Sequence, residues 1–216
     1  MLVRKNPYLF RAKNINTSES LIRSLLDAHL SSQEETIFGE FLEELAIFIC
    51  SQVYNGKKST AEGIDLEFEK ENKKFLVSIK SGPNWGNSQQ IKKMRANFRQ
   101  AKRILGQSKS VKHIICVNGC CYGIDDNPDK GDYLKLCGER FWKLMSNDAD
   151  LYTELIEPLG HKAKEKNQTF SDEYAKVVNK FTIEFSKDFC KADGSISWKQ
   201  LIAYNSGKRH RLELEY

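Results

Sequence analysis

Residues 63–80 read GIDLEFEKENKKFLVSIK, and this stretch decides the fold class of the chain. Residues 63–69 and 74–80 are both rich in β-branched and aromatic side chains, and the polar residues 70–73 separate them. Two short apolar runs joined by such a polar link are typical of a β-hairpin. We therefore expect a pair of antiparallel strands here.

Two helices are expected upstream of this hairpin. Residues 17–30 place leucines on one side of a helix, and residues 32–35 fit the capping box that satisfies free N–H groups at the start of a second helix. An apolar stripe at helical spacing then leads to Asn55-Gly56, where the second helix should end. The stripe consists of Ile37, Phe41, Leu45, Phe48 and Ile49.

Downstream of the hairpin, residues 81–88 are expected to form a loop. A helix to about Leu105 follows, and residues 112–117 form a strand that Asn118-Gly119 ends. Residues 125–132 form an acidic loop, and residues 133–157 are helical in two pieces. A long, phenylalanine-rich helix begins at Ser171 and stops at residues 192–194.

This order of elements predicts an α/β or α+β fold, in which a small central mixed β-sheet is flanked by helices. The length of 216 residues suggests a single domain over 1–216. Within it we expect a catalytic core at about 35–125 and a C-terminal helical part at about 133–216.

Charge is distributed unevenly along the chain. The 53 residues from Asn72 to Ile124 contain no Asp or Glu but 11 Lys and Arg, whereas the rest of the chain has 23 basic and 29 acidic residues. Such a concentrated positive segment indicates a polyanionic partner, most often nucleic acid. A solvated basic face is the alternative, and it is less suited to so long an acid-free stretch.

Membrane and secretory functions are not expected. The longest apolar run, residues 45–50, is far shorter than the ~20 residues of a membrane span, and residues 1–10 lack the apolar region of a signal peptide. The six cysteines therefore indicate thiols in a reducing cytoplasm. A zinc site among Cys116, Cys120, Cys121 and Cys137 is the weaker alternative, since Cys116 and Cys120 would lie about 13 Å apart on a strand.

Asp65, Ser78 and Lys80 are the residues of the hairpin that carry chemistry. Ser78 and Lys80 are two residues apart and so point to one face of their strand. An Asp beside a Lys at a strand end suits metal-assisted phosphodiester hydrolysis, because the Asp can hold a hard divalent cation and the Lys can orient the attacking water. A cross-strand ion pair on the surface is the alternative.

The run Gly63-Ile64-Asp65, followed after twelve residues by Ser78-Ile79-Lys80, resembles the signature of PD-(D/E)xK nucleases. Residues 39–43, GEFLE, are similar to the helix that precedes this signature in the superfamily. Residues 77–88, VSIKSGPNWGNS, and 138–142, GERFW, resemble motifs of a group of type II restriction endonucleases. The resemblance covers residues 35–160.

The resemblance implies a restriction-endonuclease-like fold and a Mg²⁺-dependent enzyme of restriction-modification, in which Mn²⁺ substitutes for Mg²⁺. Such an enzyme cleaves double-stranded DNA at a specific site to 5′-phosphate ends, acts as a homodimer and works in the cytoplasm of a prokaryotic cell. The dimer surface would come from residues 171–190 or 133–157.

The resemblance also implies roles for individual residues. Asp65 is the central metal ligand, Glu43 the second carboxylate, and the main-chain carbonyl of Ile79 completes the metal shell. Lys80 positions the attacking water, and Ser78 occupies a position that is acidic in most relatives. Because Ser78 supplies no charge, Glu40, Glu44 and Glu62 stay open as alternatives to Glu43.

Residues 84–102 are expected to contact DNA. Basic side chains of the helix would bind phosphates, and the polar block before it would read base edges. For Trp85 and Asn87 the alternative is that they only shape the loop. The expected DNA-binding residues are Asn84, Trp85, Asn87, Ser88, Gln89, Lys92, Arg95, Arg99 and Lys102.

Two other functions stay open. The replacement of an acid by Ser78 is compatible with a DNA-binding module whose nuclease centre has decayed. A non-specific or repair nuclease is the other alternative.

Overall fold

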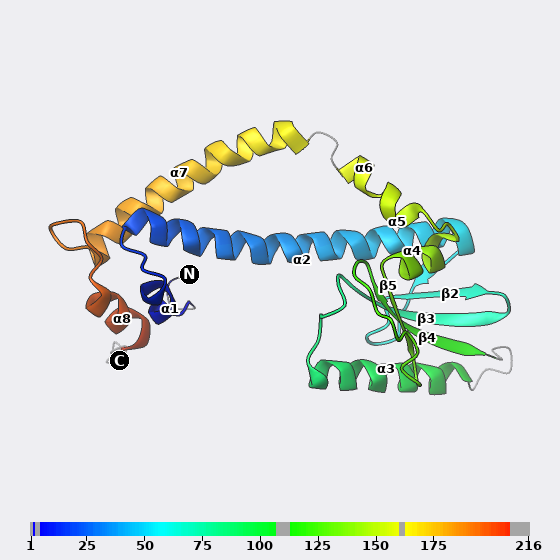
Figure 1. Ribbon diagram of the computed structural model, residues 1–216. Coiled ribbons are helices and arrows are strands. Elements are labelled where there is room, and N and C mark those ends of the chain that lie inside the picture. Colours follow the sequence, from blue (N-terminus) through cyan, green and yellow to red (C-terminus); the bar gives the residue numbers. More distant parts are fainter. Residues whose placement is uncertain (1, 3–4, 107–112, 160–162, 208–216) are drawn as a thin grey trace, which may run out of the picture. The chain divides into compact units, whose positions relative to one another are not determined.

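The computed structural model describes residues 2, 5–106, 113–159 and 163–207 (Figure 1). The chain forms two compact units. One consists of Glu35–His161, and the other of Met1–Glu34 together with Lys162–Tyr216. This division differs from the expected core at 35–125 and helical part at 133–216, and the single domain over 1–216 stays a prediction. None of the described helices is long and apolar enough to cross a membrane.

A five-stranded mixed sheet forms the centre of the 35–161 unit, which confirms the expected fold class. Its strands lie in the order β1 (Lys57–Lys58), β2 (Leu66–Lys70), β3 (Lys73–Lys80), β4 (Ile114–Cys120) and β5 (Leu134–Cys137). The first three strands pair antiparallel, and β3, β4 and β5 pair parallel. Strands β2 and β3 form the hairpin that the sequence predicts. Glu71 and Asn72 have φ values of 51° and 59°, as in the tight turns that match the twist of paired strands.

Helices cover both faces of this sheet (Figure 1). The part of α2 (Ser18–Tyr54) that belongs to this unit and α4 (Glu139–Ser146) pack on one face, around Leu42, Val77 and Phe141. Helix α3 (Ser88–Gly106) packs on the other face through Met94 and Phe98. The short helices α5 (Leu151–Glu154) and α6 (Ile156–Leu159) follow α4. The expected helix after residue 88 and its buried stripe are confirmed.

The two helices expected upstream of the hairpin are one continuous helix, α2. The prediction of a helix start at residue 32 is wrong, because Ser and Glu are also tolerated inside helices and no break precedes them. The predicted stripe is displaced as well. Leu42, Ala46 and Cys50 are the buried residues, whereas Ile37 is 65% and Phe48 61% exposed.

Two predictions downstream are also wrong. Strand β4 does not end at Asn118-Gly119 but continues to Cys120, because it pairs with β3 up to Lys80. The expected start of this strand at residue 112 lies outside the described residues. Residues 134–137 form β5 instead of a helix, since their pairing with β4 buries Cys137 at the sheet edge.

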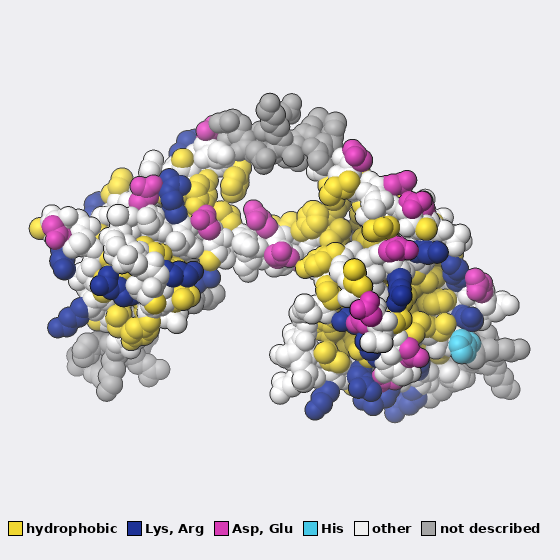
Figure 2. Space-filling model, in the orientation of Figure 1, with side chains coloured by type: hydrophobic (Ala, Val, Ile, Leu, Met, Phe, Trp, Pro, Cys, Tyr) yellow, Lys and Arg dark blue, Asp and Glu magenta, His cyan; other side chains and the backbone are white. Residues whose placement is uncertain are grey.

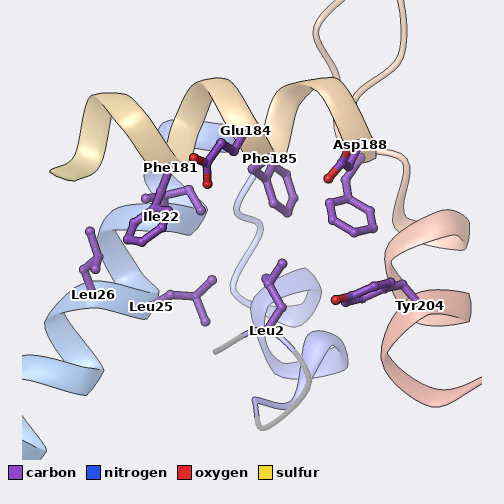
Figure 3. A pocket seen from close by; sticks show the side chains of 10 residues that line it. Leu2, Ile22, Leu25, Leu26, Phe181, Glu184, Phe185, Asp188 and Tyr204 are labelled. Carbon is purple, nitrogen blue, oxygen red and sulfur yellow. The ribbon is translucent and has the colours of Figure 1, made fainter. Parts of the chain in front are cut away.

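The second unit is helical. It contains α1 (Pro7–Ala12), the start of α2, α7 (Ala163–Phe189) and α8 (Trp198–Ser206). Helix α7 begins before Ser171, where the sequence predicts its start, but it ends as expected. A cavity of about 290 Å³ lies inside this unit, lined by apolar side chains and the carboxylates of Glu184 and Asp188 (Figure 3). Its core consists of Phe10, Leu21, Ile22, Leu25, Leu26, Val178, Phe185, Phe189, Ile196 and Leu201.

Candidate active site

The hairpin brings Asp65, Ile79 and Lys80 together. Asp65 lies directly before β2, and its Oδ2 accepts a hydrogen bond of 2.6 Å from the main-chain N–H of Ile79. Lys80 ends β3, where its Nζ lies 3.6 Å from Asp65 Oδ2 and donates to the Ile79 carbonyl at 2.6 Å. The carboxylate, the carbonyl and the ammonium group therefore meet at one end of the β2–β3 pair.

Glu43 faces this cluster from helix α2. Burial raises the pKa of Glu43, and the Asp65 carboxylate raises it further, while Lys80 and Lys58 oppose this shift. Of the alternatives, Glu40 and Glu44 are exposed on α2. Glu62 lies 3.4 Å from Lys93 in an exposed ion pair. Glu43 is thus the carboxylate that interacts with Asp65.

Gly39 lies one turn before Glu43 and faces the loop after β3. A Cβ added there would lie 3.6 Å from Ser81 Cβ, which is ordinary contact. The glycine therefore permits a close approach of helix and sheet, but alanine would also fit.

Oxygen groups of this cluster fit a hard divalent cation such as Mg²⁺, which binds carboxylates, carbonyls and waters. A cation bound there would also offset the negative charge that Asp65 places beside Glu43. Among the described residues, no group of three or more His, Cys, Asp and Glu side chains is placed to hold a metal. Asp65 and Glu43 would therefore need the Ile79 carbonyl and water to complete a shell.

Ser78 and Asn118 lie buried beside this cluster, with 2% and 1% of their surface exposed. They are neighbours in the register of β3 and β4. Asn118 Oδ1 accepts a hydrogen bond of 3.1 Å from Trp85 Nε1, and its Nδ2 donates to the Ser78 carbonyl at 3.3 Å. The Trp85 ring in turn lies 5.5 Å from Lys80 Nζ. Sequence reasoning missed Asn118, because Asn-Gly is normally a turn signal.

The loop after β3 is fixed by contacts to the β5 region. Lys135 Nζ donates to the Pro83 carbonyl at 3.0 Å and lies 3.2 Å from Asp125 Oδ2. Hydrogen bonds from Lys130 and Lys135 lower the pKa of Asp125 despite some burial. A Cβ on Gly82 would lie only 2.3 Å from the Tyr122 ring, so any larger residue here would displace this exposed ring. Next to the loop is a cleft of about 600 Å³ that residues 121–125, 137–140 and Tyr152 line.

The GERFW segment supports the site from beneath. Gly138 precedes α4, Phe141 is fully buried, and Trp142 Nε1 donates to the Cys121 carbonyl at 2.8 Å. Cys121 N–H in turn donates to the Lys80 carbonyl at 3.0 Å. This motif therefore holds the end of β3 in place through Trp142 and Cys121.

The polar block before α3 has local structural roles at two positions. Asn87 Oδ1 accepts hydrogen bonds from the main-chain N–H groups of Gln89 and Gln90 at 3.0 and 3.1 Å, which caps the helix. Trp85 packs against the α3 core in addition to bonding Asn118. Asn84, Ser88 and Gln89 are exposed. The interpretation that Trp85 and Asn87 shape the loop is therefore supported.

Basic side chains gather over α3, seen as dark blue atoms along the lower edge of the 35–161 unit in Figure 2. Lys92, Arg95 and Arg99 are exposed, and Lys102 is half-buried. Arg95 Nε lies 2.8 Å from Asp132 Oδ2. Acids from outside the acid-free segment thus neutralise part of this surface. Within the described part of the chain, Lys92, Arg99 and Lys102 have no ion pair.

The cysteines around β4 are buried thiols. Burial raises the pKa of Cys116 to about 11 and that of Cys121 to about 12. Burial and the neighbouring Cys137 also raise the pKa of Cys120. In the absence of a metal, burial therefore favours the thiol over the thiolate.

A mixed sheet whose hairpin joins an Asp to a Lys, beneath a helix that adds a Glu, defines a restriction-endonuclease-like nuclease. The family model described as "Type II restriction endonuclease EcoO109I" matches residues 1–167. The chain therefore belongs to this family of type II restriction endonucleases, which are hydrolases acting on DNA. No curated protein matches the chain. The match includes the whole 35–161 unit and ends near the start of α7.

Proposed function

We propose that this restriction endonuclease depends on Mg²⁺, for which Mn²⁺ substitutes, and cleaves both strands of a specific duplex site to 5′-phosphate ends. The observation that carries the proposal is the cluster of Asp65, Glu43 and Lys80 at the end of the hairpin. It supplies two carboxylates and an ammonium group within one small region.

Asp65 and Glu43 would hold the cation, together with the Ile79 carbonyl. Bound there, Mg²⁺ would neutralise charge on the scissile phosphate and acidify a water. Asp65 is itself oriented by the Ile79 N–H. The Ile79 carbonyl accepts one hydrogen bond from Lys80 at 2.6 Å, and its second lone pair would remain for the cation.

Lys80 would orient the attacking water and offset negative charge as the phosphorane-like transition state develops. The Lys80 side chain is 30% exposed, so the site is open to solvent at this residue. Ser78 is proposed to hydrogen-bond a metal-bound water from the vacant acid position. With 2% of its surface exposed, Ser78 can do so only if that water enters beside Lys80.

Lys92, Arg95, Arg99 and Lys102 would bind phosphates along α3, because their charges bind the backbone without regard to sequence. Asn84, Ser88 and Gln89 are exposed at the start of this helix and would read base edges. Trp85 and Asn87 would hold that reading surface in place. This arrangement supports double-stranded DNA as the partner of the protein.

We further propose a homodimer in the cytoplasm of a prokaryotic cell. A two-fold enzyme matches a palindromic site, and one copy can then cut each strand. Exposed apolar side chains on α7 and α6, including Phe181 at 39% and Ile156 at 68%, support the two expected dimer surfaces.

Incubation of plasmid DNA with the purified protein and Mg²⁺ tests this function. Discrete fragments with 5′-phosphate ends are expected. Nicking or a smear would indicate a non-specific or repair nuclease. A mobility shift without cleavage would indicate a DNA-binding module with a decayed centre, the alternative that Ser78 favours. Added EDTA should stop cleavage while leaving the melting temperature nearly unchanged, because the metal is not part of the folded core.

A further inference from the structure

Two polar side chains, Ser78 and Asn118, are buried in the described part of the chain, and both lie in the parallel part of the sheet. Strands in such a position are normally apolar on both faces. A buried amide costs free energy unless its groups are hydrogen-bonded. The partners of Asn118 therefore indicate what this residue does.

Both ends of the Asn118 amide are engaged. The Trp85 indole N–H can only donate, so the amide oxygen must face it, and this bond is 3.1 Å long. The Ser78 carbonyl can only accept, so the amide nitrogen faces it at 3.3 Å. The chemistry of the two partners thus fixes the orientation of the amide, and the amide fixes the indole relative to β3.

The face of that indole lies against the Lys80 ammonium, with Nζ 5.5 Å from the ring. At this distance the electron-rich face of a tryptophan attracts a cation. On another side, Nζ contacts the Ile79 carbonyl at 2.6 Å and Asp65 Oδ2 at 3.6 Å. The ammonium is therefore held between the aromatic ring and the oxygen groups of the cluster.

We propose that Asn118 and Trp85 are positioning residues for DNA cleavage: Asn118 fixes the indole, and the indole keeps the Lys80 ammonium beside Asp65. This inference rests on the role of Lys80 in the proposed function. It predicts that Trp85 affects the rate of cleavage. A Trp85 that contacted bases would instead affect DNA affinity.

The test compares Asn118→Leu, Trp85→Phe and the double variant. Single-turnover cleavage of a duplex site is measured with enzyme in excess, and DNA affinity is measured with Ca²⁺ in place of Mg²⁺. Trp85→Phe loses the hydrogen bond between the indole and the amide, and Asn118→Leu loses that bond together with the one to the Ser78 carbonyl. For each we expect about a tenfold lower rate with unchanged affinity, because each releases the indole from the amide. Because both variants remove the same bond, the double variant should also lose about tenfold. Gln52→Leu, at an exposed position of α2 to which no role in the site or in DNA binding is assigned, is the control and should keep the wild-type rate.

Losses that multiply in the double variant, or a loss of affinity without a loss of rate, would overturn the inference. Wild-type rates in all three variants would also overturn the inference. In that case the proposed function would still stand if Lys80→Gln is inactive. If the wild type itself does not cleave with Mg²⁺ or Mn²⁺, the proposed function fails and the inference fails with it.

A second series covers the case in which Asn118→Leu does not fold. Trp85→Phe keeps an aromatic face beside Lys80, whereas Trp85→Leu removes it. At equal DNA affinity, the cleavage rate should fall from Trp to Phe to Leu. In a Lys80→Gln background, Trp85→Leu should cause no further loss. Equal rates for Phe and Leu, or the same loss in both backgrounds, would contradict a role through Lys80.

Discussion

The two compact units of this chain bury different kinds of residue. The 35–161 unit contains the buried polar side chains Ser78 and Asn118 and a pair of facing carboxylates. In the described part of the other unit the buried residues are apolar, from Phe10 to Leu201, and the half-buried Thr182 adds one buried hydroxyl oxygen. Burial of polar groups and mutual repulsion of carboxylates cost stability, and proteins retain such costs mainly at functional sites. The difference supports the assignment of the chemistry to the 35–161 unit, whereas the buried residues of the other unit form an apolar core.

Lys80→Gln should have the largest effect. It removes the ammonium that orients water and offsets charge, so single-turnover cleavage should fall at least about a thousandfold. The melting temperature should change little, because the side chain is partly exposed. Lys74→Gln is the matched control on the same strand, where Lys74 pairs with Glu67 at 3.4 Å. Equal cleavage by both variants would remove Lys80 from the site.

Phe185→Ala should produce the opposite result in the other unit. Phe185 is 3% exposed and its ring packs at a tilt against that of Phe189, so its truncation should lower the free energy of unfolding by about 4 kcal/mol. Single-turnover cleavage well below the melting temperature should be unchanged. Phe170→Ala, at a position 50% exposed on the same helix, should hardly affect melting. A large loss of cleavage by folded Phe185→Ala would contradict the claim that the site in the 35–161 unit does not depend on the core of the other unit.

Glu43→Gln should keep the fold and DNA binding but lower cleavage at least about a hundredfold, with partial rescue by Mn²⁺. The reason is that Glu43 is the carboxylate that faces Asp65. Glu40→Gln and Glu44→Gln, at exposed positions of the same helix, are the controls. Full activity of Glu43→Gln beside an inactive Glu40, Glu44 or Glu62 variant would move the ligand to that residue.

The same variant has a stability readout in EDTA. Because burial and Asp65 raise the pKa of Glu43, the folded state binds a proton more readily than the unfolded state. Stability from this residue is therefore lost as the pH rises through its raised pKa and is recovered at acidic pH. Glu43→Gln should melt slightly above the wild type at neutral pH, and the difference should shrink as the pH falls. A variant that melts lower at neutral pH would contradict the crowding of the two carboxylates.

Arg99→Ala and Arg95→Ala should have the smallest effects. Loss of one phosphate contact should reduce the slope of log affinity against log salt by about 0.9. Arg99→Ala should weaken binding more than Arg95→Ala, because Asp132 already holds Arg95 at 2.8 Å. Asp132→Asn should in turn tighten DNA binding. Affinity that does not depend on salt would contradict the assignment of α3 to the phosphate backbone.

The sequence predicted the hairpin and the α3 helix well, because both have local signals. Strands β2 and β3 are short apolar runs that a tight turn joins, and the apolar stripe of α3 faces the sheet as its spacing requires. Asp65 and Lys80 were therefore placed together correctly. The resemblance of residues 39–43 to a family helix also pointed to Glu43, on which the Asp65 carboxylate acts.

The parts that could not be predicted depend on distant partners. Asn118-Gly119 has the composition of a turn, but pairing with β3 and the Phe141 ring against Gly119 keep it in a strand. The buried face of α2 differs from its most hydrophobic stripe for a similar reason. Residues such as Phe48 stay exposed because the sheet contacts Ala46 and Cys50 instead. The acids that pair with α3, Glu62 and Asp132, lie outside the acid-free segment, so the composition of that segment does not reveal them.

The most direct test of the central claim is plasmid cleavage by the wild type and by Asp65→Asn, in parallel and with Mg²⁺. Asp65 joins every part of the site, since it contacts Ile79 and Lys80 and faces Glu43. We predict discrete fragments from the wild type and intact plasmid from Asp65→Asn, which should still fold and bind DNA. Discrete fragments from Asp65→Asn at the wild-type rate would contradict the assignment of the catalytic centre to the hairpin.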